Sequence, residues 1–238
     1  MIKGNLSSII TIIITIILAV TVYSLEFNVF NTESSLMSST KKYIHQFEDG
    51  KKYEPQYVLS QKIGSQMIVV FSDKNYDNFM GAIVFQRGIT GLWRPTKAQF
   101  ETGPVIGSIT TNVNLNEDIY TVHFSVNCPS EIKSYQLSNI YIDKNNRYVN
   151  DVLNEKKITK PKFIDAYKTD MTLSLSLYDK DGIELPREKY LAINQKYPNA
   201  AMGSEMISPN VICFFIIAIG VCVSWLFSRK QRTRRGTS

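Results

Sequence analysis

Residues 66–86, QMIVVFSDKNYDNFMGAIVFQ, contain the clearest β-hairpin pattern in the chain. Residues 66–72 are a short run rich in β-branched side chains, and residues 79–86 are a second apolar run. Between them, residues 73–78 supply Asp and Asn, whose side chains bond to nearby backbone groups and so favour turns. Two such runs joined by a short polar segment predict an antiparallel hairpin.

The sequence that follows this hairpin is also mainly of β character. In residues 171–178, MTLSLSLY, apolar side chains alternate with Thr and Ser, as in a strand with one face on a core. Residues 119–126 largely alternate too, and His123 falls on the more polar face, where we expect it to contact solvent. Further strands are expected at residues 89–94, 106–113 and 132–142.

Two helices are expected at the edges of this β-rich region. Thr32 can cap a helix that runs to about residue 48, and Pro186 can open one that runs to residue 197. Together these elements predict an α+β, mainly β domain with a sandwich-like second half.

Two uncharged apolar segments flank this domain. Residues 6–25 contain 20 residues without a charge, and residues 211–227 contain 17. A hydrocarbon layer about 30 Å thick needs roughly 17–25 apolar helical residues, so both segments are long enough to cross a membrane. The predicted organisation is a cytoplasmic N-terminus (1–5), a transmembrane helix (6–25), an extracytoplasmic domain (26–207), a second transmembrane helix (208–227) and a basic cytoplasmic tail (228–238).

The distribution of charge supports this topology. Of the 27 basic residues, six lie between an apolar segment and the nearer end of the chain: Lys3 before the first segment and five after the second. The remaining 21 are balanced by all 21 acidic residues, so the central region is neutral. The positive-inside rule then places both ends in the cytoplasm, and a neutral domain does not favour nucleic-acid binding.

The five basic residues that follow the second apolar segment, and the first apolar segment itself, can each be interpreted in a second way. The cluster is expected to be a stop-transfer flank, and such tails also attract anionic lipid. The first segment is either an uncleaved anchor or a signal peptide cut after Ser24. We favour the anchor, because the apolar run has full length and no A-x-A-like site ends it.

Cell-wall anchoring is excluded, because Leu185-Pro186-Arg187 lacks the Thr-Gly of a sortase motif.

Small residues recur at helical spacing in both apolar segments. Such residues let membrane helices approach closely, so these positions predict a packing face, either between the two segments or against another membrane protein. The candidate residues of this face are Ser8, Thr11, Thr15, Ala19, Gly220 and Ser224.

The sequence supplies little support for catalysis or cofactor binding. Only Cys128 lies in the central region, so a disulfide scaffold is excluded. His45 and His123 have no metal-ligand spacing around them, and a nucleophilic pair of Cys128 with His123 has no motif to support it. We therefore expect no catalytic residues, no metal and no cofactor, and a protein that is not an enzyme.

One loop stands out as a candidate binding site. Residues 87–95, RGITGLWRP, contain the only Trp of the central region, with arginine beside it and glycines around it. Trp and Arg are frequent at binding hot spots, so Arg87, Trp93 and Arg94 are the candidate partner-binding residues. The alternative is that Trp93 fills the core beside a tight turn.

These features predict a membrane-anchored, non-enzymatic accessory or sensory subunit of a bacterial cell envelope. The bacterial origin is inferred from abundant Lys, Ile, Asn and Tyr with scarce Cys. The expected partners are the lipid bilayer and another membrane protein, or a second copy bound through the spans, and no nucleic acid. The alternatives are an envelope enzyme with an unrecognised external site and a structural protein that binds lipid or wall polymer.

Overall fold

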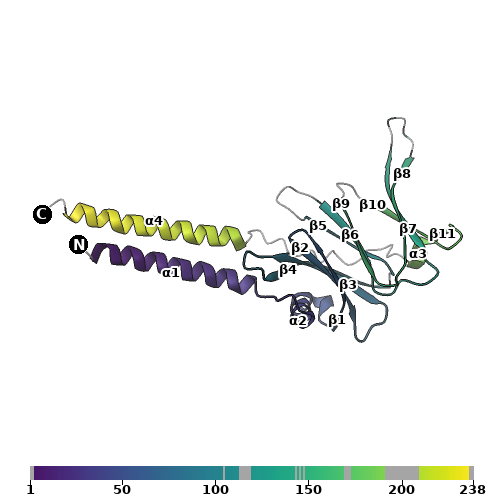
Figure 1. Ribbon diagram of the computed structural model, residues 1–238, viewed down its shortest axis with the longest axis horizontal. Coiled ribbons are helices and arrows are strands. Elements are labelled where there is room, and N and C mark those ends of the chain that lie inside the picture. The colour runs from purple at the N-terminus through teal and green to yellow at the C-terminus, as the bar shows by residue number, and fades with distance from the viewer. Residues whose placement is uncertain are drawn as a thin grey trace. The chain divides into compact units, whose positions relative to one another are not determined.

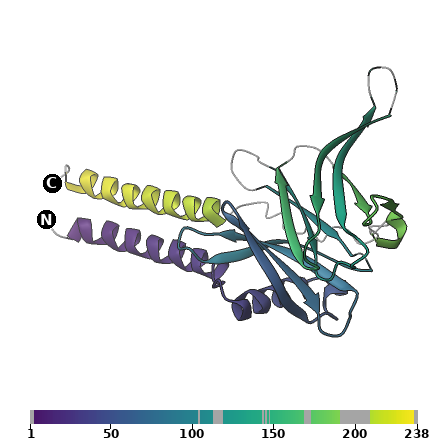
Figure 2. The same ribbon diagram turned by 45° about the vertical axis from the view of Figure 1, so that its right-hand side comes forward.

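The computed structural model describes residues 3–103, 105–112, 119–142, 144, 146, 148–168, 173–190 and 209–235. The chain forms two compact units: a helix pair (residues 1–28 and 204–238) and a β unit (residues 29–203). The fold is mixed α+β and mainly β, as the sequence predicts (Figures 1 and 2).

The helix pair consists of α1 (Lys3–Glu26) and α4 (Pro209–Arg235), which pack against each other. They run antiparallel, because Ser8 lies beside Ser224 and Ala19 lies beside Cys213. Among the described helices, α1 is the one that is long and apolar enough to cross a membrane, over Ser7–Glu26. The apolar run of α4, Val211–Leu226, is shorter.

The first sheet of the β unit has the strand order β1-β2-β3-β4, and every neighbouring pair is antiparallel. The predicted hairpin is confirmed, because Gln66 pairs with Gln86 and Val69 pairs with Ile83. The strands of this sheet are β1 (Pro55–Ile63), β2 (Gln66–Asp73), β3 (Phe79–Arg87) and β4 (Trp93–Thr102).

The strand expected at residues 89–94 is wrong in its bounds. The observed strand β4 begins at Trp93 and passes through Pro95, beyond the predicted end at residue 94. The register shifts by one residue between Val84 and Phe85 of β3, so Thr96 has no directly paired residue. A proline lacks the N–H that a strand ladder uses, and a bulge is where a sheet tolerates it.

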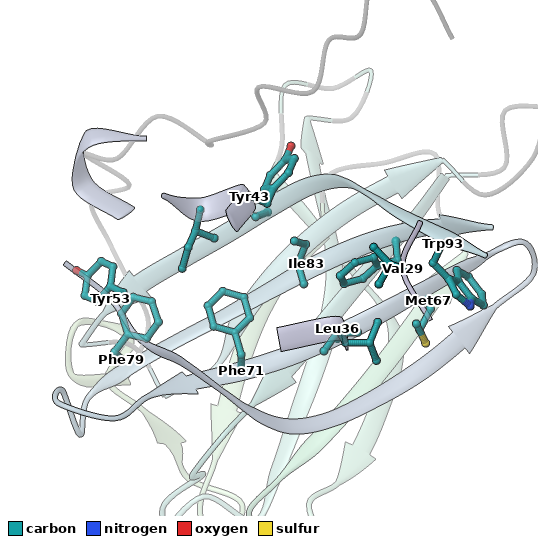
Figure 3. Packing of buried hydrophobic residues seen from close by; sticks show 13 residues of the cluster. Val29, Leu36, Tyr43, Tyr53, Met67, Phe71, Phe79, Ile83 and Trp93 are labelled. Carbon is teal, nitrogen blue, oxygen red and sulfur yellow. The ribbon is translucent and has the colours of Figure 1, made fainter. Parts of the chain in front are cut away.

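One face of this sheet packs on the helix α2 (Glu33–Ile44) and on the segments around it (Figure 3). The Thr32 hydroxyl accepts a hydrogen bond from the Ser35 N–H (3.4 Å), as expected of an N-cap. The helix ends at Ile44 rather than at residue 48, and the short 3₁₀ helix η1 (Glu48–Gly50) follows. The buried residues of this layer include Leu36, Tyr43, Ile44, Tyr53, Phe71, Phe79 and Trp93.

The second sheet covers the opposite face of the first. It has the order β5-β6-β9, and its strands are β5 (Gly107–Asn112), β6 (Ile119–Ser125) and β9 (Phe163–Lys168). Ile109, Val122 and Phe124 pack on Ile68 and Val70 of β2. Strands β2 and β3 are therefore buried on both faces, which explains why their residues are apolar without alternation.

The third sheet packs on the other face of the second, where Phe163 and Tyr167 of β9 join a cluster with Tyr135, Leu137 and Leu177. It has the order β11-β10-β7-β8, with β7 (Ser134–Ile142), β8 (Tyr148–Lys157), β10 (Leu173–Tyr178) and β11 (Glu184–Leu185). The β unit is thus built as α2, then three successive sheets.

Most strands of the second half match the predicted positions, namely β5, β6, β7 and β10. Strands β1, β8, β9 and β11 were not predicted from the sequence. The short helix α3 (Arg187–Tyr190) falls within the helix expected at residues 186–197, and residues 191–197 lie outside the described part of the chain.

Candidate functional site

The structure separates the three residues of the predicted binding loop. Trp93 is 4% exposed and lies in the core under α2, and its backbone N–H and C=O bond to Val29 (2.9 and 3.0 Å). Arg94 is also buried, whereas Arg87 is exposed. The tip of the loop instead presents Ile89, which is 88% exposed. Of the three candidates, only Arg87 is therefore available on the surface.

Five of the six predicted packing-face residues, all except Thr11, make contacts between α1 and α4. The Ser8 hydroxyl donates to the Ser224 carbonyl (3.3 Å), and the Ser224 hydroxyl donates to the Ser8 carbonyl (3.5 Å). A Cβ atom added at Gly220 would lie 2.2 Å from the Thr15 hydroxyl, so the two helices touch there without space for a side chain. The Cys213 thiol donates to the Ala19 carbonyl (3.5 Å).

The remaining residue of that set, Thr11, uses its hydroxyl within its own helix. Its hydroxyl donates to the Ser7 carbonyl (3.0 Å), and the Thr15 hydroxyl donates to the Thr11 carbonyl (2.8 Å). These bonds satisfy the hydroxyl groups inside an apolar helix, where an unpaired polar group would be costly.

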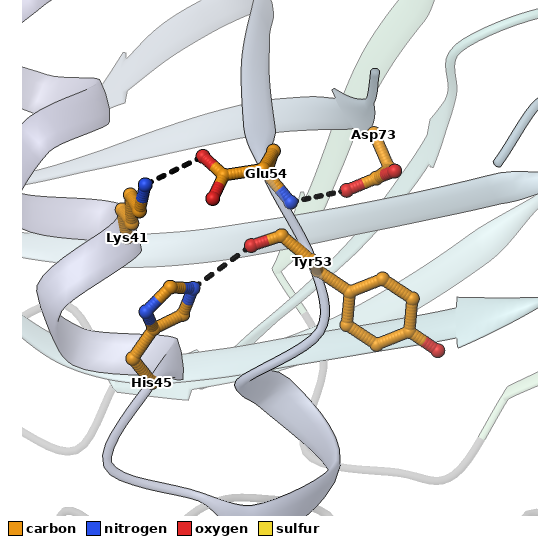
Figure 4. A network of polar contacts seen from close by, with 5 residues as sticks. All are labelled: Lys41, His45, Tyr53, Glu54 and Asp73. Carbon is orange, nitrogen blue, oxygen red and sulfur yellow. Dashed lines mark hydrogen bonds and ion pairs between the residues drawn. The ribbon is translucent and has the colours of Figure 1, made fainter. Parts of the chain in front are cut away.

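A polar network fastens α2 to the first sheet (Figure 4). Lys41 forms an ion pair with Glu54 (2.6 Å), and His45 Nε2 donates to the Tyr53 carbonyl (2.9 Å). The Asp73 carboxylate accepts a hydrogen bond from the Glu54 N–H. The hydrogen bond from Lys41 lowers the pKa of the Glu54 carboxyl. Each group has a structural partner, so the network explains how the helix is held on the sheet.

A second polar cluster lies where β6 and β9 face the third sheet. We call His123, Tyr135, Lys156, Asp165 and Tyr167 the polar cluster. His123 and Asp165 are directly paired across β6 and β9, so their side chains share one face. The Tyr135 hydroxyl donates to Asp165 Oδ2 (2.6 Å) and lies 2.6 Å from the Tyr167 hydroxyl. Lys156 forms an ion pair with the same carboxylate.

The position of His123 corrects the expectation that it contacts solvent. The third sheet covers it, and it is 3% exposed, with ring centroids 6.3 Å from Tyr135 and 6.1 Å from Tyr167. Within the described residues, neither ring nitrogen makes a hydrogen bond. Burial lowers the pKa of His123 to about 4, although the Asp165 charge acts in the opposite direction. The imidazole is therefore neutral at pH 7.

The pKa shifts in and near the polar cluster fit a structural role that holds two sheets together better than a catalytic one. Burial, followed by the hydrogen bond to Asp165, raises the pKa of Tyr135 well above its usual range. Burial also raises the pKa of the Cys128 thiol to about 11. A nucleophilic Cys–His pair needs a thiolate and an imidazolium, and both shifts oppose that ion pair. The cluster instead links β7 and β8 to β9, and so joins two sheets.

Sequence reasoning did not find the polar cluster, because three of its members lie on β8 and β9, which were not predicted as strands. The alternation of residues 119–126 put His123 on one face, but only the pairing with β9 shows that Asp165 lies beside it. No group of three or more His, Cys, Asp or Glu residues in the described part of the chain could hold a metal ion.

Comparison with protein-family models, with curated proteins and with solved structures finds no match to this chain.

Proposed function

We propose that this chain is a membrane-anchored, non-enzymatic accessory or sensory subunit. In this proposal α1 and α4 both cross the membrane, the two termini are cytoplasmic, and the β unit binds a partner outside the cell. The observation that carries the proposal is the reciprocal contact of the two helices. Small and hydroxyl-bearing side chains join them from Ser8 and Ser224 to Ala19 and Cys213, while long apolar side chains cover their outer surfaces.

The second span rests on the pairing of α4 with α1. The run Val211–Leu226 measures about 24 Å at 1.5 Å per residue, somewhat less than the hydrocarbon thickness. Because α4 lies antiparallel beside α1 over this length, a bilayer that surrounds α1 also surrounds α4. The exposed Ile and Phe side chains of α4, such as Phe214 (66% exposed) and Ile219 (62% exposed), suit contact with lipid.

Topology is tested with a reporter fused after Ser238. At this position we expect activity from a reporter that works only in the cytoplasm. A reporter that works only outside the cell should be inactive. The opposite pattern would overturn the double-pass arrangement. N-terminal sequencing of the mature protein should begin before residue 24, since cleavage after Ser24 would leave a single span.

The partner contact is proposed at the tip of the β3–β4 loop. Arg87 is exposed and is of a residue type that is frequent at binding hot spots, and Ile89 near it exposes an apolar side chain. Trp93 and Arg94 lie buried beneath them, so in this proposal these two residues hold the loop rather than contact the partner.

Co-purification from native membranes in mild detergent tests this contact. We expect the wild-type chain to bring down another membrane protein, and Ile89→Asp with Arg87→Glu to reduce its yield about tenfold or more. The matched control is Ile183→Asp, which alters another exposed isoleucine (62% exposed) on a different turn. A partner-free monomer from native membranes would contradict the proposal.

A further inference from the structure

We infer that the basic end of α4, residues 229–235, is a binding site for the phosphate groups of anionic phospholipids. This inference rests on the proposed second span. The helix α4 does not end with its apolar run at Leu226 but continues to Arg235. Its last seven residues, RKQRTRR, contain four Arg, one Lys and no acidic residue.

The distribution of these cations around the helix distinguishes two kinds of partner. At about 100° per residue, the five basic positions are spread around the whole axis, and the largest gap between neighbours is about 100°. A helix that lies on a membrane surface, or in an acidic groove of a protein, carries its cations on one side. Cations on every side fit a helix that leaves the bilayer upright, with headgroups all around it.

The described part of α4 extends beyond the described start of α1. Ser8 lies beside Ser224, so Lys3, the first described residue of α1, is level with about residue 229 of α4. The residues from Lys230 to Arg235 therefore continue about 9 Å beyond that level. A headgroup layer is about 5–8 Å thick on each side of the hydrocarbon, so the basic segment spans one such layer.

In the described part of the helix pair, acidic residues are scarce. Among the described residues of the helix pair, Glu26 is the only acidic one, and it lies at the opposite end of α1, about 35 Å away. The described part of the helix pair therefore places no acidic residue beside this segment. Arginine binds phosphate oxygens through two parallel hydrogen bonds, and four of the five cations are arginines, which points to phosphate as the ligand group.

Trp225 provides a direct reporter, because it is 58% exposed and lies four residues, about one helical turn, before Arg229. The full-length chain is reconstituted into phosphatidylcholine vesicles that contain phosphatidylglycerol, with bromine on the acyl chains of one lipid or the other. Quenching of Trp225 then measures which lipid lies beside the helix. In a Trp225→Phe variant the remaining tryptophan fluorescence comes from Trp93, and this signal is the baseline for the quenching measurement.

We expect brominated phosphatidylglycerol to quench Trp225 more strongly than brominated phosphatidylcholine at equal mole fraction. The variant R232Q/R234Q/R235Q keeps two basic residues as a stop-transfer flank and should lower this preference about fivefold or more. The variant K160Q/K162Q/K180Q removes the same charge from exposed positions of the β unit and should keep it. Sodium phosphate and sodium chloride at equal ionic strength should weaken the preference equally, because the ligand is a lipid rather than free phosphate.

Two outcomes would overturn the inference, and they differ in what they say of the second span. Equal quenching by both lipids would refute the anionic lipid site while leaving α4 in the bilayer, and an acidic protein segment would then be the counter-charge. Quenching by neither lipid would show that α4 is not in the bilayer, and both the site and the second span would be refuted.

Discussion

His123 is the residue whose environment differs most from what its sequence context suggests. Its neighbours on the polar face of β6, Thr121 and Ser125, predict contact with water, yet the third sheet covers the imidazole. Two tyrosines, Tyr135 and Tyr167, and the Asp165 carboxylate face it. A neutral histidine is tolerated in such a site, whereas a charged one is costly. This cost gives the β unit a dependence on pH.

We predict that His123 makes the protein less stable in mild acid. Above pH 6.5 the imidazole is neutral in both the folded and the unfolded chain. Between pH 6.5 and about 4 the unfolded chain binds a proton that the folded chain does not, because the pKa of His123 is lowered to about 4. The free energy of unfolding should fall across this window by about 3 kcal/mol at most.

The measurement is denaturant unfolding of the wild-type chain and of His123→Leu at several pH values between 7 and 4.5. Carboxylates titrate in both proteins, so the difference between the two slopes isolates the histidine. Parallel slopes would show that His123 is not the group responsible.

At the scale of single elements, two glycines set how closely neighbouring segments approach. In β3, a Cβ at Gly81 would lie 2.4 Å from the Phe71 ring of β2, and in α4 a Cβ at Gly220 would meet Thr15 of α1. The first contact lies in the core beneath α2, and the second joins the helix pair. Each glycine is required because of a partner on another element rather than because of its own backbone angles.

Gly81→Ala should destabilise the first sheet by about 1–3 kcal/mol, because the added methyl group overlaps the Phe71 ring. Thermal or denaturant unfolding measures the loss. A second variant, Phe71→Leu in the Gly81→Ala background, removes the overlapping ring and should recover part of it. If Gly81→Ala were as stable as the wild type, the close packing of these two strands would be disproved.

Gly220→Val should separate the helix pair. We would replace Ser8 and Ser224 by Cys in a chain whose Cys213 and Cys222 are Ser, and measure the disulfide that forms within one chain on oxidation. Efficient cross-linking is expected with Gly220 and strongly reduced cross-linking with Val, since the side chain overlaps Thr15. Val221→Leu, at an exposed position (57% exposed), is the matched control and should cross-link normally.

The molecule as a whole shows which features sequence alone can predict. The hairpin of β2 and β3 was predictable because two apolar runs flank a turn of Asp and Asn. Strand β8 was not, because residues 150–157, NDVLNEKK, are all exposed and have no apolar alternation, and only pairing with β7 makes them a strand. The polar cluster was hidden for the same reason, since it is formed by strands that meet only in the folded chain.

The division into two units leads to a prediction for the isolated β unit. All three apolar core clusters consist of residues between Val29 and Tyr190, so none of them uses the helix pair. A fragment of residues 29–203 should therefore fold cooperatively. Its melting temperature should lie within about 4 °C of that of the β unit in the full chain, a difference of about 1 kcal/mol. Calorimetry or circular dichroism can measure this, and a fragment that does not fold would show that the helices contribute to the core.

The bridge between Val29 and Trp93 also has a mechanical consequence. Val29 is the first residue of the β unit, and it is buried and bonded through both backbone groups to the start of β4. Tension along α1 would pass through the chain to this bridge before it could reach α2. The two hydrogen bonds and the burial of Val29 would together resist this tension. The force would then act on β4, the strand that follows the loop with Arg87 and Ile89. A force applied to α1 would thus act first on the strand next to the loop that is proposed to bind the partner.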